Sequence, residues 1–199
     1  ANLLSDTNKS GTGGIFIVNN SNTGGSTTQI DGNLDTSTAS PDDIQLIHNG
    51  VSTAKVVVAG NVTTHQGGDI LVWSDGGIDL SGVFMGSDDV SITALGQSAV
   101  IRGPITADVD GPGNGLIAYA APFAQTKLYP TAVLTAPNVL LGFADNPTPL
   151  IQSLLGGWIG TNSISGVNAT GGAYAKAADK PAVQILTNNL TAVLFGSLN

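Results

Sequence analysis

The stretch GGDILVWSDGGIDLSGVF, residues 67–84, decides the fold. Its two Gly-Gly pairs, three aspartates and six aliphatic residues fit a calcium-binding loop, the edge of an active site, or one unit of a repetitive β-structure. Ile70 and Val72 stand two positions apart in it, so they are expected on the same face of a strand. Whether its pattern recurs elsewhere in the chain separates these three interpretations.

The first half of the pattern recurs without gaps. DIQLIHNG (43–50), DILVWSDG (69–76) and DVSITALG (89–96) each begin with Asp, carry apolar residues at the second and fourth places, and end with Gly. GIFIVNN (14–20) is similar to an earlier, degenerate copy in which Gly14 takes the place of the aspartate. Self-similarity at a fixed spacing is typical of repeat architectures.

A second element follows, with the pattern aliphatic–x–Gly–x–aliphatic. It occurs as IDGNL (30–34), VAGNV (58–62), LSGVF (80–84), IRGPI (101–105) and LFGSL (194–198). The glycines at 60, 82 and 103 lie 22 and 21 residues apart, and each follows an Asp element. The positions predicted to form the structural repeat are therefore Asp43, Gly50, Gly60, Asp69, Gly76, Gly82, Asp89, Gly96 and Gly103.

A period near 22 residues with two or three short strands predicts an all-β chain folded as a parallel β-helix, or β-solenoid. An antiparallel β-sandwich or jelly roll is the alternative; it explains the strands but not the aligned Asp and Gly positions. The chain divides into an N-terminal arm (1–12), repetitive coils (13–111) and irregular, apolar, β-rich C-terminal coils or a cap (112–199). Within the last part, residues 146–157 are expected to hold a short helix.

The segments GDILVWSDGGIDLSGVF and DDVSITALGQSAVIRGPITA resemble the degenerate repeats of filamentous-haemagglutinin-type adhesins. The resemblance covers about residues 13–111. It implies a right-handed β-helix within a large secreted surface protein. The Asn-Pro-Asn-type secretion-domain signature of that family is not evident in this sequence.

The composition restricts the kinds of partner that the chain is expected to bind. Charged residues make up 10% of the chain, all fourteen acidic residues are aspartate, and the net charge is −8. Nucleic acid is not expected as a partner, because binding phosphates requires clustered Lys and Arg and the chain has six. The sequence contains no apolar run of eighteen residues, so no transmembrane segment is predicted. The Asp-, Asn-, Thr- and Gly-rich surface favours an extracellular, cell-surface location.

Candidate chemistry is weak. Calcium is possible, but GGDIL and GGIDL lack the spacing of calcium-binding nonapeptides, so we expect no cofactor and no metal site. Asp88 and Asp89 resemble the paired aspartates of pectin-cleaving β-helix hydrolases, yet the remaining elements of those sites are missing. We expect turn aspartates to bond to backbone N–H groups instead.

Trp73 is expected to point outward, where it could stack on a sugar ring or on a partner. With Asp88 and Asp89 it forms the candidate ligand site. His48 is expected in an exposed turn, and Arg102 is expected to pair with an aspartate of an adjacent coil such as Asp79.

These patterns predict an extracellular structural protein that is not an enzyme. It would be a fibre or sheath subunit, or an adhesin module, whose main partner is another copy of itself. Two alternatives stay open: a β-helix that binds or cleaves carbohydrate, with surface glycans as partners, and a sandwich-type pilin subunit that donates a terminal strand.

Overall fold

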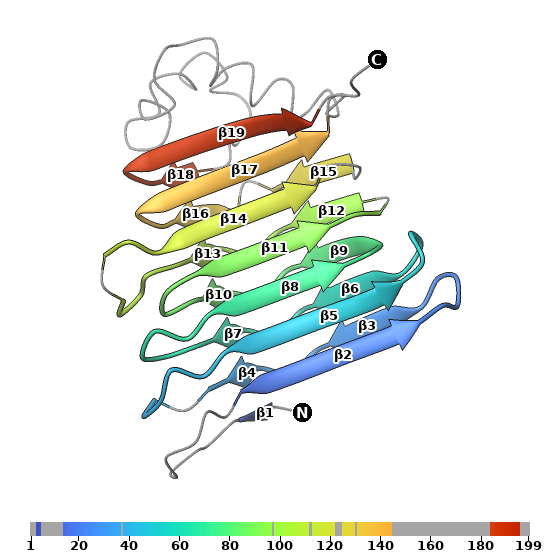
Figure 1. The fold of residues 1–199 in the computed structure, drawn as a ribbon, viewed down its shortest axis with the longest axis horizontal. Coiled ribbons are helices and arrows are strands. Elements are labelled where there is room, and N and C mark those ends of the chain that lie inside the picture. Colours follow the sequence, from blue (N-terminus) through green and yellow to red (C-terminus); the bar gives the residue numbers. More distant parts are fainter. Residues whose placement is uncertain are drawn as a thin grey trace.

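The chain folds as a β-solenoid of stacked coils, seen in a computed structural model (Figure 1). The structure describes residues 3–4, 14–36, 38–96, 98–111, 113–121, 125–129, 131–144 and 184–195. Strands from successive coils form three parallel sheets, which we call A, B and C. The described residues include no helix, and the alternative of an antiparallel sandwich or jelly roll is wrong because their strands pair in parallel.

Sheet A contains the shortest strands and has seven of them. In stacking order these are β1 (Leu3–Leu4), β4 (Leu34–Asp35), β7 (Val62–Thr63), β10 (Phe84–Met85), β13 (Ile105–Thr106), β16 (Val133–Thr135) and β18 (Gln184–Leu186).

Sheet B contains the longest strands and also has seven. They are β2 (Ile15–Ser21), β5 (Ile44–Gly50), β8 (Ile70–Ser74), β11 (Val90–Ala94), β14 (Leu116–Ala121), β17 (Asn138–Ala144) and β19 (Asn189–Phe195).

Sheet C has five strands, which pair in the same parallel manner. They are β3 (Thr27–Ile30), β6 (Lys55–Val58), β9 (Gly77–Leu80), β12 (Ser98–Ile101) and β15 (Gln125–Leu128).

The register of sheet B is the one that the sequence alignment predicts. Ile44 pairs with Ile70 and Ile70 with Val90, so the three Asp elements stack position by position. Ile15 pairs with Ile44, which places Gly14 level with Asp43, as expected of the degenerate copy. Each copy therefore supplies one strand of sheet B.

The core is filled by rows of aliphatic side chains that point inward from all three sheets. Alternation along each strand sends every second side chain inward. Ile44, Leu46, Val72 and Ile92 are completely buried in sheet B, and Ile78 and Leu80 in sheet C. A single coil cannot bury such a row by itself, so the stack is the unit of stability.

The second element turns the chain from sheet C to sheet A. Gly60, Gly82 and Gly103 stack there on the backbone of the preceding coil, Gly60 on that of Gly32; we call these four residues the glycine column. A Cβ on Gly82 would lie 1.8 Å from the carbonyl oxygen of Gly60, and one on Gly103 would lie 1.9 Å from that of Gly82. Only a residue without a side chain fits this spacing.

Two details of the repeat differ between the sequence pattern and the structure. Gly50 lies at the end of β5 opposite Ser21, whereas Gly76 packs against the backbone of Ala54, because the turn that follows Gly50 is longer than the turn after β8. The fifth match, LFGSL, is not a copy of the second element, since Leu194 and Phe195 belong to β19 of sheet B.

The stack continues past residue 112. β14 pairs with β11, β17 with β14 and β19 with β17, all in register, so regular strands extend into the part expected to be irregular. The segments TAPNVLLGFA (135–144) and NNLTAVLFGSL (188–198) are similar in sequence, and their strands pair from Asn138 with Asn189 onward. The helix predicted at residues 146–157 lies outside the described residues, and so does the arm at 1–12 apart from β1.

Candidate functional site

Trp73 points outward from β8, as its place in the alternation predicts. It lies between Ile47 on β5 and Thr93 on β11, and its side chain is half-buried. The indole Nε1 donates a hydrogen bond to Oδ1 of Asp75 at 3.0 Å. This bond uses the polar atom of the ring and leaves its apolar surface on the outer face of sheet B.

Asp88 and Asp89 lie at the opposite end of the strands, at the corner where the chain enters β11. The N–H of Asp89 donates to Oδ1 of Asp69 at 3.0 Å, and Oδ1 of Asp89 accepts the N–H of Leu116 at 2.8 Å. The N–H of Asp88 bonds to the carbonyl of Gly68, and its own carbonyl accepts the N–H of Asp108. Both residues thus connect adjacent coils.

The structure does not bring the three candidate residues together. Trp73 pairs with Thr93, four residues beyond Asp89, which corresponds to about 13 Å along the strands. A single sugar ring does not touch both the indole and the carboxylates. The geometry of this trio gives no support to a carbohydrate-cleaving site.

Asp43, Asp69 and Asp89 form a vertical row, which we call the aspartate column. Oδ1 of Asp43 accepts the N–H of Asp69 at 2.9 Å, and the same bond repeats from Asp69 to Asp89. Further along the corner, Asn138 accepts a hydrogen bond from the side chain of Asn189 at 3.0 Å. The carboxylates therefore satisfy backbone donors of the next coil, as expected of structural aspartates.

The neighbouring carboxylates of the aspartate column affect the pKa of Asp69. Burial raises the pKa of Asp69; the N–H of Asp89 opposes that shift, and the carboxylates of Asp43 and Asp89 add to it. The pKa of Asp88 is also raised, mainly by burial and then by the charges of Asp89 and Asp108. Stacking like charges has an electrostatic cost that the backbone hydrogen bonds offset.

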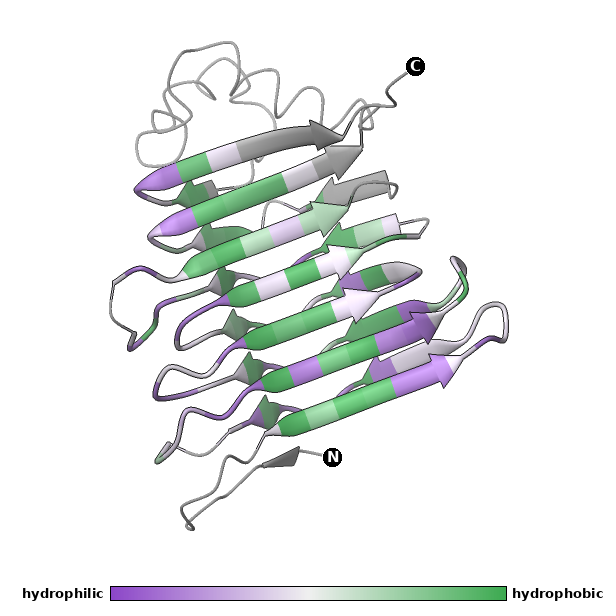
Figure 2. Ribbon diagram, viewed as in Figure 1, coloured by the Kyte–Doolittle hydropathy of each residue, from purple (hydrophilic) through white to green (hydrophobic). Residues whose placement is uncertain are grey.

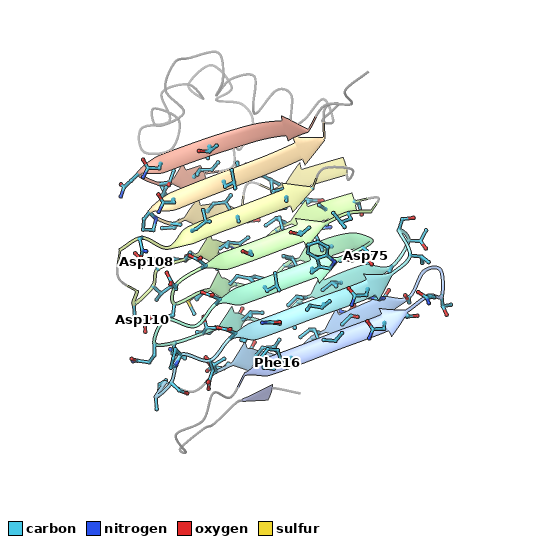
Figure 3. The ribbon with its side chains drawn as sticks, viewed as in Figure 1. Phe16, Asp75, Asp108 and Asp110 are labelled. Atoms are coloured by element: carbon cyan, nitrogen blue, oxygen red, sulfur yellow. The ribbon has the colours of Figure 1, made fainter. Side chains whose placement is uncertain are left out.

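Beside the column, Asp110 attaches a loop to the preceding coil through its carboxylate, in addition to the backbone bonds of Asp108 and Val109. Asp110 accepts hydrogen bonds from the hydroxyl of Ser87 and from the N–H of Gln66, and Ser87 in turn accepts the N–H of Gly67. The bond from Ser87 is the main cause of the lowered pKa of Asp110. Figure 3 shows Asp108 and Asp110 in this loop, at the end of the sheet opposite Asp75.

The prediction for His48 is wrong, because this residue is completely buried at the end of β5. Its Nδ1 lies 3.0 Å from the hydroxyl of Thr28 and its Nε2 lies 3.0 Å from that of Ser26. Both ring nitrogens are thus occupied by hydroxyls of the coil. The alternation of β5 places His48 on the same face as Leu46, and that signal could have identified it as inward-facing.

His65 lies at the surface and pairs with one acid. Its Nε2 is 3.0 Å from Oδ1 of Asp35. Within the described residues, no three His, Cys, Asp or Glu side chains gather in a way that could hold a metal ion. In the same residues, no helix has the length and apolarity needed to span a bilayer.

The outer face of sheet C carries the charged cluster. Nε of Arg102 lies 3.0 Å from Oδ1 of Asp79, and Nζ of Lys55 lies 3.5 Å from Oδ2 of the same residue. The guanidinium also stacks over the ring of Tyr129 at 4.3 Å from its centroid. The predicted pairing of Arg102 with Asp79 is therefore confirmed, and with Lys55 and Tyr129 it forms a cluster that spans four consecutive coils.

The outer face of sheet B is largely apolar, unlike that of sheet C. Figure 2 shows hydrophobic residues along most of its strands. Phe16 and Val18 on β2 are 60% and 52% exposed, and Leu140 on β17 is 37% exposed. Ile47, Leu71 and Trp73 lie between them, half-buried.

The sequence pattern indicated Trp73 on this face, whereas Phe16, Val18 and Leu140 were missed. A signal was present, since segments such as GIFIVNN, DILVWSDG and NVLLGF are apolar at consecutive rather than alternate positions. A strand with this pattern is apolar on both faces. In a solenoid one of these faces points outward, so consecutive apolar residues mark an apolar outer surface.

An open groove of about 660 Å³ follows the corner between sheets A and B. The hydroxyls of Thr106 and Thr135 line it, together with Asp108 and with the exposed apolar side chains of Val109 and Leu186. Its lining does not include Trp73, Asp88 or Asp89. Its mixed walls do not identify a particular ligand.

Comparison of the chain with protein-family models, with curated proteins and with solved structures found no match.

Proposed function

We propose that this chain is a structural, non-catalytic β-solenoid module of an extracellular assembly, which extends when further β-coils stack on the ends of its sheets. The observation that carries this proposal is the condition of the core at its ends. Ile17 on β2 and Ile30 on β3 belong to the inward rows but are only partly buried. Their counterparts one coil further on, Leu46 and Val58, are completely buried.

The opposite end repeats this pattern. Leu190 on β19 packs against the core and is only partly buried, whereas its partner Val139 is 2% exposed. A row of aliphatic side chains that ends without cover loses the burial that every internal coil gains. Another coil stacked on either end would supply that cover.

The backbone groups of the edge strands support the same proposal. In the described residues β2 and β3 pair on one side only, with β5 and β6. Since Lys55 donates to the carbonyl of Ser26, and Ala59 to that of Ile30, the N–H groups of Thr27 and Gln29 point away from β6. An edge with such groups is a template for a further parallel strand.

The extracellular setting and the adhesin-like role rest on the sequence. The Asp-, Asn- and Thr-rich composition and the resemblance of residues 13–111 to filamentous-haemagglutinin-type repeats support them. The β-solenoid fold is compatible with that resemblance. The role follows from shape: a rigid, in-register stack holds its surfaces at fixed spacing along an assembly.

The test compares Gln29→Pro with Gln29→Ser by sedimentation velocity over a range of concentrations. Proline removes the N–H that points to the next coil, whereas serine keeps it. We expect the wild type and Gln29→Ser to form species that grow with concentration, and Gln29→Pro to stop this growth. Thermal unfolding, followed by circular dichroism, checks that both variants fold.

Two outcomes would contradict the proposal. One is a wild-type protein that stays monomeric at every concentration and binds a polysaccharide instead. The other is growth that proceeds equally in Gln29→Pro and Gln29→Ser, since the edge of β3 would then have no part in it.

A further inference from the structure

The outward side chains of sheet B are large at one end of the stack and small further along it. The outward side chains of β2, β5 and β8 are large apart from Val18, and we call them the raised half: Phe16, Val18, Gln45, Ile47, Leu71 and Trp73. Those of β11 and β14 are short, and we call them the hollow half: Ser91, Thr93, Ala118 and Ala120. Both halves occupy the same two outward positions of the repeat.

The hollow half forms a depression in the surface. A cavity of about 150 Å³ opens there, with Thr93, Ala118 and Ala120 in its lining and Leu140 on β17 at its far side. Side chains one or two carbons long explain the depression, because the flanking strands carry leucines at the same position. The hollow therefore follows directly from the sequence of β11 and β14.

We propose that two copies of this chain pair face to face through sheet B, around a two-fold axis parallel to β8. Such an axis places β2 over β14 of the other copy and β5 over β11, while β8 faces itself. An interface of this symmetry requires that a raised position meets a hollow one and that the reverse contact repeats it. Away from the axis the order of residue sizes meets this requirement, because the four raised positions of β2 and β5 lie over the four hollow positions of β14 and β11, while the axis strand β8 meets itself.

The individual contacts agree in position and in chemistry. The axis keeps the strand direction, so Phe16 is set over Ala118 and Ile47 over Thr93. Gln45 faces Ser91, so the one polar side chain of the raised half meets a polar side chain of the hollow half. Trp73 and Leu71 meet their own copies at the axis, where aromatic and aliphatic side chains are typical of the centre of an interface.

The raised and hollow halves suit an uncharged partner surface such as their own. The chain carries a net charge of −8, so two copies repel each other, yet the raised and hollow halves contain no charged residue. The ion pairs of Asp79 with Lys55 and Arg102 lie on sheet C instead. Salt should therefore strengthen the pairing, because it screens the repulsion between the other faces.

The size of the face sets the expected affinity. Five strands about 4.8 Å apart and five to seven residues long cover roughly 500 Å² on each copy. Both copies together bury about 1,000–1,200 Å², at the low end of specific interfaces. A dissociation constant on the order of micromolar is expected, and the pairing of two sheets at about 10 Å resembles the core of a β-sandwich.

The experiment measures dimer formation by sedimentation equilibrium in a Gln29→Pro background, so that growth at the coil ends does not contribute. Ala118→Arg fills the hollow and Leu71→Lys places two cations at the axis. Val100→Lys is the matched control, since Val100 is a half-buried outward residue of β12 on sheet C, next to Asp79. Thermal unfolding of each variant verifies the fold.

We expect a micromolar dimer that tightens between 50 and 500 mM NaCl, at least a tenfold loss of affinity in Ala118→Arg and Leu71→Lys, and no change in Val100→Lys. The proposal is overturned if the Gln29→Pro protein stays monomeric at several hundred micromolar. It is also overturned if Ala118→Arg and Leu71→Lys dimerise as well as the control. Either result leaves the stacking of coil ends unaffected, because that property is read from the variants at Gln29 alone.

Discussion

The glycine column and the aspartate column recur with the same period but differ in what holds them. In the glycine column, the backbones of neighbouring coils approach so closely that a side chain has no room: a Cβ on Gly60 would lie 2.0 Å from the carbonyl oxygen of Gly32. In the aspartate column, a side-chain oxygen accepts a backbone N–H of the next coil. The same corner accommodates Gly14, Leu116 and Asn138. Repetition in a sequence therefore marks two kinds of position, one sterically obligatory and one replaceable.

The largest expected effect is at the glycine column. Gly82→Val places a branched side chain against the backbone of Gly60, and neither coil can move without breaking hydrogen bonds of sheets A and C. A loss of more than about 3 kcal/mol in the free energy of unfolding is expected. Urea unfolding followed by circular dichroism measures it.

Gly67→Ala is the control for this variant. Gly67 has a positive φ of 90°, and no heavy atom lies within 4 Å of the place that a Cβ would occupy, so the substitution has a conformational cost but no steric one. We expect a loss of about 1 kcal/mol. Equal losses in Gly82→Val and Gly67→Ala would show that close approach between coils does not govern the corner.

A smaller effect is expected at the aspartate column. Asp89→Ala removes the acceptor for the N–H of Leu116, which costs about 1 kcal/mol. Asp88→Ala is the neighbouring comparison, because Asp88 contributes to the coil contacts through its backbone, which alanine keeps. Urea unfolding should rank Asp89→Ala clearly below Asp88→Ala in stability, and the reverse order would contradict the role of the column.

The smallest expected change in stability comes from removing one charge of the aspartate column. Asp69→Asn keeps an oxygen that accepts the N–H of Asp89 but removes one of three stacked charges. Asparagine already acts this way elsewhere in the chain, since Oδ1 of Asn61 accepts the N–H of Val83. At neutral pH the variant should be as stable as the wild type or more stable by a few tenths of a kcal/mol, because solvent screens this exposed site.

The pH dependence of that difference has a defined sign. A folded pKa above the unfolded value means that folding becomes more favourable as the pH falls through the folded pKa, until both states are protonated below the unfolded pKa. The advantage of Asp69→Asn over the wild type should therefore shrink between pH 7 and pH 3. An advantage that grows as the pH falls would mean that the pKa of Asp69 is lowered rather than raised.

Much of the fold could be predicted because its determinants are local and repeated. The spacing of Gly60, Gly82 and Gly103 and the alignment of Asp43, Asp69 and Asp89 indicate the solenoid and the register of sheet B. The coil after β15 escaped the pattern because the turn from Leu128 to Leu134 is longer than the one from Ile101 to Ile105. There Tyr129 stacks on Arg102 of the preceding coil.

The surfaces were harder to predict, because they combine residues from several coils. The raised and hollow halves of sheet B become apparent only when Phe16 and Ala118 are known to occupy equivalent positions. The burial of His48 depends on hydroxyls from Ser26 and Thr28, which lie outside its own strand. Alternation alone predicts that Trp73 points outward, but its distance from Asp88 and Asp89 required the register.

Negative-stain electron microscopy of the wild-type protein tests the central claim, self-association of a structural β-solenoid, most directly. One copy should extend roughly 30 Å along the stacking direction, since sheet B has seven strands about 4.8 Å apart. We expect rods whose length increases in steps of about one molecule as the concentration rises, and whose growth stops in Gln29→Pro. Uniform single particles at every concentration would contradict self-association through the coil ends.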